Sequence, residues 1–358
     1  MNLKTKLSYK VFLIVLLISF QYGTGYWVNY GWEIFNYVTS AHVASLGNAT
    51  IAYPIKSAAG SIINPFSQLK DRRKIELSHQ SRYSGLINSD IIGGQILVNQ
   101  KTALNFNILY EGIGSIPDTR GALMDWGLDG VIGTNDIGEN NGVLDEGERL
   151  DKSKINYFSQ RQIAFHSSFL RSVNNQNIGF GIKFLHYKLD NHFALGFGLD
   201  LGKNIRIKGV DYAVVLRNFP SSGLIWDQGT IEGTTPSFSF GVHLPYSFKK
   251  YPVKYHFLIS IDMNTDNRDL DSRYNFGRLN LEPSYGFELK LLEKICIRLG
   301  RNKLNVITGG LGINWSLLEI DYAFIASNFG TGLGNHHLFT ISISKDILKK
   351  YFKNSFYN

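Results

Sequence analysis

The sequence has 358 residues and a single cysteine, Cys296, so no disulfide can form within the chain. After the first 25 residues, no apolar run approaches the length of about eighteen residues that a membrane-spanning helix needs. The formal net charge is +8, but the basic residues are scattered and do not form the dense stripe typical of nucleic-acid-binding proteins. No set of nucleophile, base and acid stands out either. We therefore expect neither an enzyme nor a nucleic-acid partner.

The first 25 residues have the three parts of an export signal. Lys4, Lys6 and Lys10 form a basic start, residues 11–20 form an apolar run, and small residues follow at 23–25. The apolar run is too short to cross about 30 Å of hydrocarbon as a helix. We predict a cleaved signal peptide over residues 1–25. Export without a later helix leaves two options, which are a soluble exported protein and a β-barrel.

Long stretches of strict alternation favour the barrel. In residues 193–202, for example, Phe and Leu alternate with Ala, Gly and Asp, and residues 237–248, 253–263 and 285–291 follow the same rule. Runs of about nine to twelve residues suit a tilted strand that crosses a bilayer, whereas strands of soluble sandwiches have about five or six. The Phe-rich face suits lipid and the Gly- and Ser-rich face suits a lumen. A soluble lectin-like sandwich is the alternative.

The pattern predicts an all-β fold, a transmembrane antiparallel barrel of about fourteen strands over residues 73–346. The expected strands are 73–84, 88–98, 103–112, 156–172, 177–190, 192–204, 210–218, 237–248, 253–264, 278–290, 294–300, 304–314, 317–326 and 336–346. The longest connections, 113–155, 219–236, 265–277 and 327–335, all follow odd-numbered strands. With a periplasmic N-terminus they lie outside the cell, and the basic tail 347–358 lies in the periplasm.

Residues 26–72 precede the first strand and lack long alternation. Their many Ala and Gly residues allow close packing against other backbone. We predict that this segment lies inside the barrel as an N-terminal plug, and a disordered periplasmic lead is the alternative.

Three stretches of the sequence form a recognisable series of motifs. The first, here called the plug motif, consists of Gly47, Asn48, Asn64 and Pro65. The second is Leu216–Phe219 followed by Pro236, and the third is Glu319–Phe324 followed by residues 334–337 and 340–344. Together these stretches resemble the PorV/PorQ family, which is related to the FadL-type fatty-acid transporters of the outer membrane. The sequence departs from the family pattern at Phe66, at Pro220 and in the tail that follows the last strand.

The resemblance implies a fourteen-stranded barrel with an N-terminal hatch in the bacterial outer membrane, surrounded by lipid. PorV-like members serve type IX secretion, receiving exported proteins at the cell surface, so secreted proteins or other secretion components are the expected partners. FadL-like members instead pass hydrophobic small molecules through the barrel. The expected function is protein export or surface attachment, and the alternative is a channel for hydrophobic small molecules. Composition and periodicity do not choose between them.

The most specific local chemistry lies in the acidic extracellular insertion, residues 117–153. Carboxylate and amide oxygens recur there with glycine between them, as in loops that bind Ca²⁺. Residues at the offsets of an EF-hand loop follow Asp136, although Ile137 stands where the first ligand belongs. The predicted Ca²⁺ ligands in the 125–148 loop are Asp136, Glu139, Asn141, Asp145 and Glu148. The alternative is a solvated loop without metal.

Overall fold

The computed structural model describes residues 29–55, 57–67, 74–174, 176–248, 251–265, 274–277, 279–315, 317–327 and 334–344. The predicted signal peptide and the predicted periplasmic tail lie outside the described residues.

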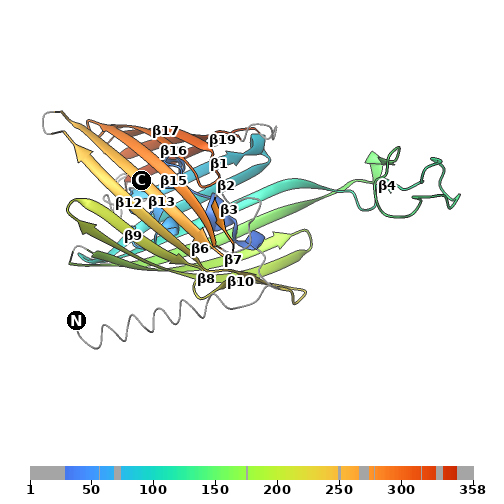
Figure 1. Ribbon diagram of the computed structural model, residues 1–358, viewed down its shortest axis with the longest axis horizontal. Coiled ribbons are helices and arrows are strands. Elements are labelled where there is room, and N and C mark those ends of the chain that lie inside the picture. The colour runs from blue at the N-terminus through green and yellow to red at the C-terminus, as the bar shows by residue number, and fades with distance from the viewer. Residues whose placement is uncertain are drawn as a thin grey trace, which may run out of the picture.

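Fourteen antiparallel strands close into a barrel (Figure 1). Each strand pairs with the next in the ring, and β19 pairs with β1, so no edge is left open. The ring is β1 (Lys74–Arg82), β2 (Ile87–Asn99), β3 (Thr102–Asp118), β6 (Asn156–Val173), β7 (Gln176–Leu189), β8 (His192–Ile207), β9 (Val210–Arg217), β12 (Ser237–Ser247), β13 (Val253–Asn264), β15 (Leu279–Leu291), β16 (Ile295–Arg301), β17 (Ile307–Trp315), β18 (Leu318–Ile325) and β19 (His336–Ser344). The predicted fold class is confirmed, and each predicted strand overlaps one strand of the ring.

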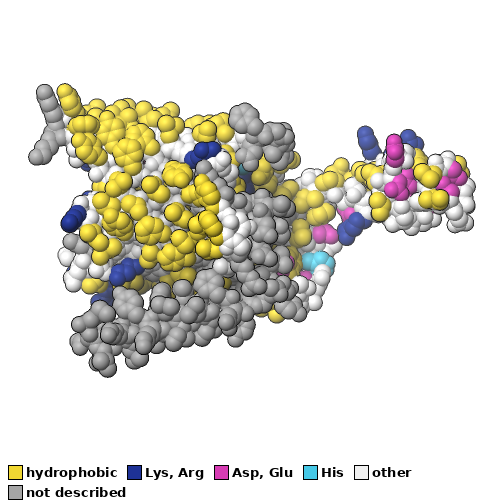
Figure 2. Space-filling model, viewed as in Figure 1, with side chains coloured by type: hydrophobic (Ala, Val, Ile, Leu, Met, Phe, Trp, Pro, Cys, Tyr) yellow, Lys and Arg dark blue, Asp and Glu magenta, His cyan; other side chains and the backbone are white. Residues whose placement is uncertain are grey.

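The barrel carries its apolar side chains outward and its polar side chains inward. On β8, Phe193, Leu195 and Phe197 are exposed, whereas Asp200 is fully buried. Figure 2 shows apolar side chains over the outer wall of the barrel. This pattern is the reverse of a soluble protein and matches a barrel whose wall faces lipid. Among the described residues, no helix combines the length and the apolar character needed to cross a membrane.

Within the described ranges, five short strands lie outside the ring. They are β4 (Leu123–Met124), β5 (Arg149–Leu150), β10 (Ser222–Trp226), β11 (Ile231–Thr234) and β14 (Tyr274–Phe276). The prediction that residues 219–236 form a connecting loop was wrong in part, because β10 and β11 form a hairpin there and β10 also pairs with β8. Each run is only four or five residues long, too short for alternation to reveal it.

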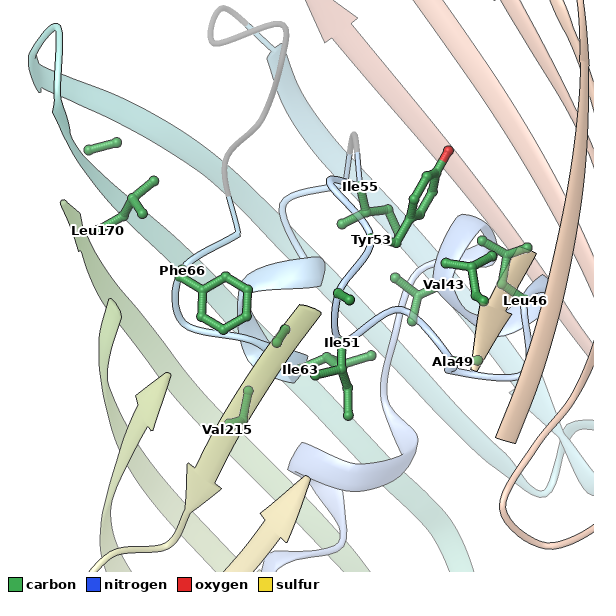
Figure 3. Packing of buried hydrophobic residues seen from close by; sticks show 14 residues of the cluster. Val43, Leu46, Ala49, Ile51, Tyr53, Ile55, Ile63, Phe66, Leu170 and Val215 are labelled. Carbon is green, nitrogen blue, oxygen red and sulfur yellow. The ribbon is translucent and has the colours of Figure 1, made fainter. Parts of the chain in front are cut away.

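The described residues of the range 29–67, here called the inner segment, pack against the inward face of the strands. They contain η1 (Asn29–Trp32), α2 (Ile34–Tyr37), α3 (Ala41–Ser45) and α4 (Gly60–Ile63), and most of their described apolar side chains are buried (Figure 3). Two further 3₁₀ turns, η2 (Tyr83–Gly85) and η3 (Lys152–Lys154), lie in connections. The predicted role of this segment, closing the lumen as a plug, stays a prediction.

Glycine residues in the wall strands let the inner segment approach the wall closely. A Cβ atom added at Gly300 of β16 would lie 2.4 Å from the backbone nitrogen of Gly47, and one at Gly179 of β7 would lie 2.3 Å from the carbonyl carbon of Pro65. Both distances are shorter than any real contact of a Cβ atom. Glycine at these two wall positions is therefore required by the packing.

The connection between β3 and β6 is an elongated loop. Residues 119–155, here called the long loop, project from one end of the barrel, and β4 and β5 pair within them (Figure 1). Acidic side chains gather on this loop in Figure 2.

Candidate functional site

A pocket of about 290 Å³ lies at the end of the barrel from which the long loop projects. Its wall comes from the last residues of β1 and β18, the first residue of β19 and the connection between β16 and β17, and its floor comes from the inner segment. It is lined by Asn36, Tyr37, Thr39, Asn48, Gln80, Arg82, Tyr83, Asn302, Lys303, Leu304, Val306, Ile325, Ala326, Ser327 and His336. We call it the outer pocket.

The lining of the outer pocket is mixed in character. Leu304, Val306 and Ile325 supply apolar surface, and several amide and hydroxyl side chains stand among them. The charge of Arg82 is balanced, because its guanidinium donates to the carboxylate of Glu111 and lies over the ring of Tyr37, 5.9 Å from the centroid. The pocket therefore offers apolar surface together with hydrogen-bonding groups, a combination suited to a small amphipathic molecule.

A second, smaller cavity lies on the other side of helix α3. It measures about 20 Å³ and is lined by His42, Lys290, Glu293, Cys296, Arg298, Gly312, Ile313, Asn314, Glu319 and Asp321. We call it the inner cavity.

Helix α3 lies between the outer pocket and the inner cavity, as three successive inward-facing residues of β18 show. Asp321 lines the inner cavity, Ala323 packs against Ala41 and Ala44 of α3, and Ile325 lines the outer pocket. Residues 306–312, which include the first part of β17, repeat this order. Val306 lines the outer pocket and Gly312 lines the inner cavity, and between them the hydroxyl of Thr308 donates to the carbonyl of Ser45 in α3 at 3.0 Å. Helix α3 is thus the partition between them.

The start of α3 is fixed by two hydroxyl groups. The Ser40 side chain caps the helix by accepting from the backbone nitrogen of Val43 at 3.5 Å, and the backbone nitrogen of Ala41 donates to the Thr340 hydroxyl of β19 at 2.8 Å. Such caps satisfy backbone N–H groups that the first turn of a helix leaves open. The sequence therefore forms a single helical turn here, tied to the wall.

A buried charge network holds the inner side of this partition. Arg298 Nε donates to Glu288 Oε2 at 2.7 Å, and Arg298 Nη1 donates to Asp321 Oδ1 at 2.6 Å. Lys290 Nζ lies 3.2 Å from Glu288 Oε1, and the hydroxyl of Tyr53 also donates to that oxygen. Two carboxylates thus meet two cations, which is the condition under which charges are tolerated in a buried site.

His42 connects α3 to this network. Its Nε2 lies 3.2 Å from Glu288 Oε2. Burial, and next the nearby charge of Arg298, lower the pKa of His42 despite the opposing effect of Glu288. The imidazole is therefore held neutral at neutral pH.

A second polar chain lies beside Tyr53. His243 shares a hydrogen bond with Asp211 at 2.8 Å through Nδ1 and another with His256 Nδ1 at 2.9 Å through Nε2. The ring of Tyr53 lies edge-on to the ring of His243, with the centroids 4.8 Å apart. No role was assigned to these histidines from the sequence, and neither this arrangement nor the network around Glu288 was predicted. The available signal was the charged and histidine residues at inward strand positions.

The plug-motif residues all have structural positions in the inner segment. Gly47 and Asn48 have positive φ angles of 63° and 58°, which turn the chain after α3. The Asn64 side chain donates to the carbonyl of Ile51 at 2.9 Å, and Pro65 lies against Gly179. Only Asn48 lines the outer pocket, so the motif shapes the fold of the segment more than the surface of the site.

The predicted calcium ligands lie in the long loop, but they do not all come together. Asp136 accepts from the nitrogen of Asp129 at 2.8 Å, and Glu148 accepts from the nitrogen of Gly127 at 3.0 Å. Glu139 turns away to the nitrogens of Gly133 and Asn135, while Asn141 donates to Asp145 at 2.6 Å. In the part of the chain that the structure describes, no group of three or more His, Cys, Asp or Glu side chains has the arrangement of a metal site. Calcium binding stays a prediction.

No family model matches this sequence, and no curated protein matches it. Among solved structures, the chain is similar to the Ralstonia pickettii toluene transporter TbuX, with 9% identity and a TM-score of 0.49 over 85% of this chain and 98% of that one. It is also similar to the Pseudomonas putida toluene transporter TodX, with 11% identity and a TM-score of 0.49 over 86% and 97% of the two chains. A Pseudomonas aeruginosa FadL homologue has 10% identity and a TM-score of 0.46 over 86% and 98%. These values are too low to transfer a function. Membership of the PorV/PorQ family stays a prediction.

Proposed function

We propose that this protein lies in a bacterial outer membrane and admits small, mainly apolar molecules through its barrel. The closed antiparallel ring with an even number of strands and an apolar outer wall is the architecture of bacterial outer-membrane barrels. The observation that carries the transport proposal is the alignment of two spaces on opposite sides of a single helical turn, α3.

The volume of the outer pocket limits the ligand. An apolar cavity of about 150 Å³ can hold one benzene molecule, and the outer pocket, at about 290 Å³, has almost twice that volume. A monocyclic aromatic compound or a short amphipathic chain therefore fits. The amides around the pocket would bind one polar group of such a molecule.

Passage requires α3 to leave its place between the pocket and the cavity. Its contacts with β18 and β19 are made by the small side chains of Ala41 and Ala44, so separating the helix from these two strands exposes little apolar surface. The charge network around Glu288 holds the neighbouring wall in place. In this proposal the helix is the moving part and the network is the fixed frame.

A disulfide between the end of α3 and the wall tests this proposal. A Cβ atom at Gly286 would lie 3.2 Å from Cβ of Leu46, slightly less than the separation of about 3.5–4.5 Å in disulfides. It would also lie 2.8 Å from the carbonyl oxygen of Leu46, so the end of the helix must shift slightly to admit the new side chain. Leu46→Cys with Gly286→Cys is made in a Cys296→Ser background and reconstituted into liposomes. We expect uptake of toluene and of a medium-chain fatty acid to fall to background after oxidation and to return after reduction.

The two single-cysteine variants are the matched controls, and the uptake of each should be the same under oxidising and reducing conditions. Equal uptake by the oxidised and reduced double variant, with the cross-link verified by mass spectrometry, would contradict the proposal.

Protein export or surface attachment is the second candidate function. The observation that favours it is the long loop, which projects from the barrel and exposes Leu128, Ile132 and Ile137. Exposed apolar side chains that project together are typical of protein contacts.

Deleting residues 121–150 and joining the ends through a Gly-Ser turn separates the two candidates. If the protein serves export, the deletion releases surface-attached proteins into the medium, as measured by mass spectrometry of culture fractions, and leaves small-molecule uptake unaffected. If it is a channel, surface attachment is unaffected, because the deleted residues do not line the outer pocket.

A further inference from the structure

Two basic side chains stand together on the outward face of the barrel. Arg161 of β6 is directly opposite Lys188 of β7, and both are exposed. Like charges at opposite positions destabilise a strand pair unless an anion lies between them. Among the described residues neither side chain has an ion-pair partner, and the neighbouring Asp190, in the turn after β7, forms none with them.

The position of this pair along the strand places it at the edge of the lipid. The outward residues between Arg161 and Arg171 on β6 are Ile163, Phe165, Ser167 and Phe169. A rise of about 3.3 Å per residue and a tilt of about 40° give about 25 Å between the two arginines, which equals the usual height of the apolar band. Arg161 and Arg171 therefore mark its two boundaries, with Arg161 on the side of the long loop.

An apolar track begins beside the pair. Phe165, Phe184 and Phe197 are in register across β6, β7 and β8, and their side chains are 42%, 48% and 47% exposed. The rings of Phe184 and Phe197 are 5.3 Å apart. Such a surface accommodates an acyl chain whose headgroup lies at the level of the two cations.

We propose that Arg161 and Lys188 bind the phosphate group of an anionic lipid in the outer leaflet, with an acyl chain of that lipid along Phe165 and Phe184. A phosphate accepts from a guanidinium through two parallel hydrogen bonds, and the ammonium of Lys188 adds a second charge. His186, exposed on the same face and stacked on Phe193 with centroids 6.2 Å apart, adds a ring nitrogen near the headgroup. This lipid site does not depend on the transport proposal.

Native mass spectrometry of the full chain in detergent tests the site. The probes are diphosphorylated lipid A, the same lipid without phosphates, phosphatidylethanolamine and inorganic phosphate. We expect specific adducts with diphosphorylated lipid A alone. In Arg161→Gln with Lys188→Gln, binding should weaken about thirtyfold, because each basic side chain near an anionic lipid surface contributes about 1 kcal/mol.

Two further variants isolate the pair. Arg171→Gln, at the opposite boundary of the same strand, should keep the adduct, and exchanging the two side chains as Arg161→Lys with Lys188→Arg should keep it as well. Heat-modifiable migration on gels checks that each variant is folded. The proposal is overturned by equal binding of the dephosphorylated lipid, by binding of inorganic phosphate alone, by equal loss in Arg171→Gln, or by unchanged binding in the double glutamine variant.

Discussion

The inner segment and the long loop both lack long strands, yet the structure holds them in opposite ways. The inner segment is buried and makes polar contacts with the barrel wall as well as with itself, as between Ala41 and Thr340 or Thr308 and Ser45. The long loop is largely exposed, and its carboxylates accept from its own backbone nitrogens, as between Asp136 and Asp129. A barrel can therefore order a strandless segment by surrounding it, whereas a projecting loop must satisfy its own polar groups.

The largest difference between the two regions should appear when a carboxylate is removed from each. Glu288→Ala leaves Arg298 and Lys290 with an uncompensated charge in a buried site, which costs about 3–5 kcal/mol. Glu146→Ala in the exposed long loop should change stability by less than about 0.5 kcal/mol. Urea unfolding of the two variants in lipid vesicles measures both values. A loss below about 1 kcal/mol for Glu288→Ala would show that the network does not support the inner segment.

The next effect concerns backbone contact between the inner segment and the wall. In Gly300→Ala the new methyl group meets the backbone of Leu46 and Gly47 at 2.4 Å, so the variant should lose about 1–3 kcal/mol. Gly309→Ala is the matched control on the next strand, because its nearest neighbours lie 3.7 Å away. The control should be neutral or slightly stabilising. The same unfolding assay compares the two, and equal stability would mean that the inner segment shifts freely.

The comparison of the ring with the inner segment also shows which parts of the fold and the site could be predicted from the sequence. Alternation in a strand such as residues 192–204 records which face meets lipid, so the ring was predictable strand by strand. The hairpin of β10 and β11 was not, because its runs are too short to show a period. The small residues of the inner segment predicted close packing, but not which wall positions they would meet. Contacts such as that between His42 and Glu288 join residues far apart in the sequence, and a single sequence carries no signal for such pairs.

A smaller effect should follow from acidification. The pKa of His42 is lowered from 6.5 in the folded protein, so below that pH the unfolded chain binds a proton more readily than the folded chain does. The contribution of His42 is therefore fully present above pH 6.5 and is lost as the pH falls from there toward the lower folded pKa. For one proton the slope is at most about 1.4 kcal/mol per pH unit.

Unfolding free energies of the wild type and His42→Gln across this pH range measure the effect. The variant should lose part of the slope, whereas His192→Gln at the exposed start of β8 should keep it. Identical slopes in all three proteins would exclude His42 as the titrating group.

The smallest effect should come from calcium, and only in the long loop. Asp145 lies close to the turn that holds Asp136. A Cβ atom added at Gly138 would lie 3.1 Å from Asp145 Oδ2 and 3.7 Å from Cα of Gly127, whose own added Cβ atom would meet the carboxylate of Asp136. If metal binds here, Ca²⁺ at about millimolar concentration, the range of extracellular modules, should produce heat in calorimetry and slow proteolysis of the loop. Asp136→Asn with Asp145→Asn should abolish both, while Glu146→Gln keeps them. Barrel unfolding should be unchanged throughout, because the ion would order only a region that makes its contacts with itself. If the wild type produces no heat, the loop is ordered by its own amide hydrogen bonds and not by calcium. If calcium shifts the stability of the barrel, the two regions are coupled.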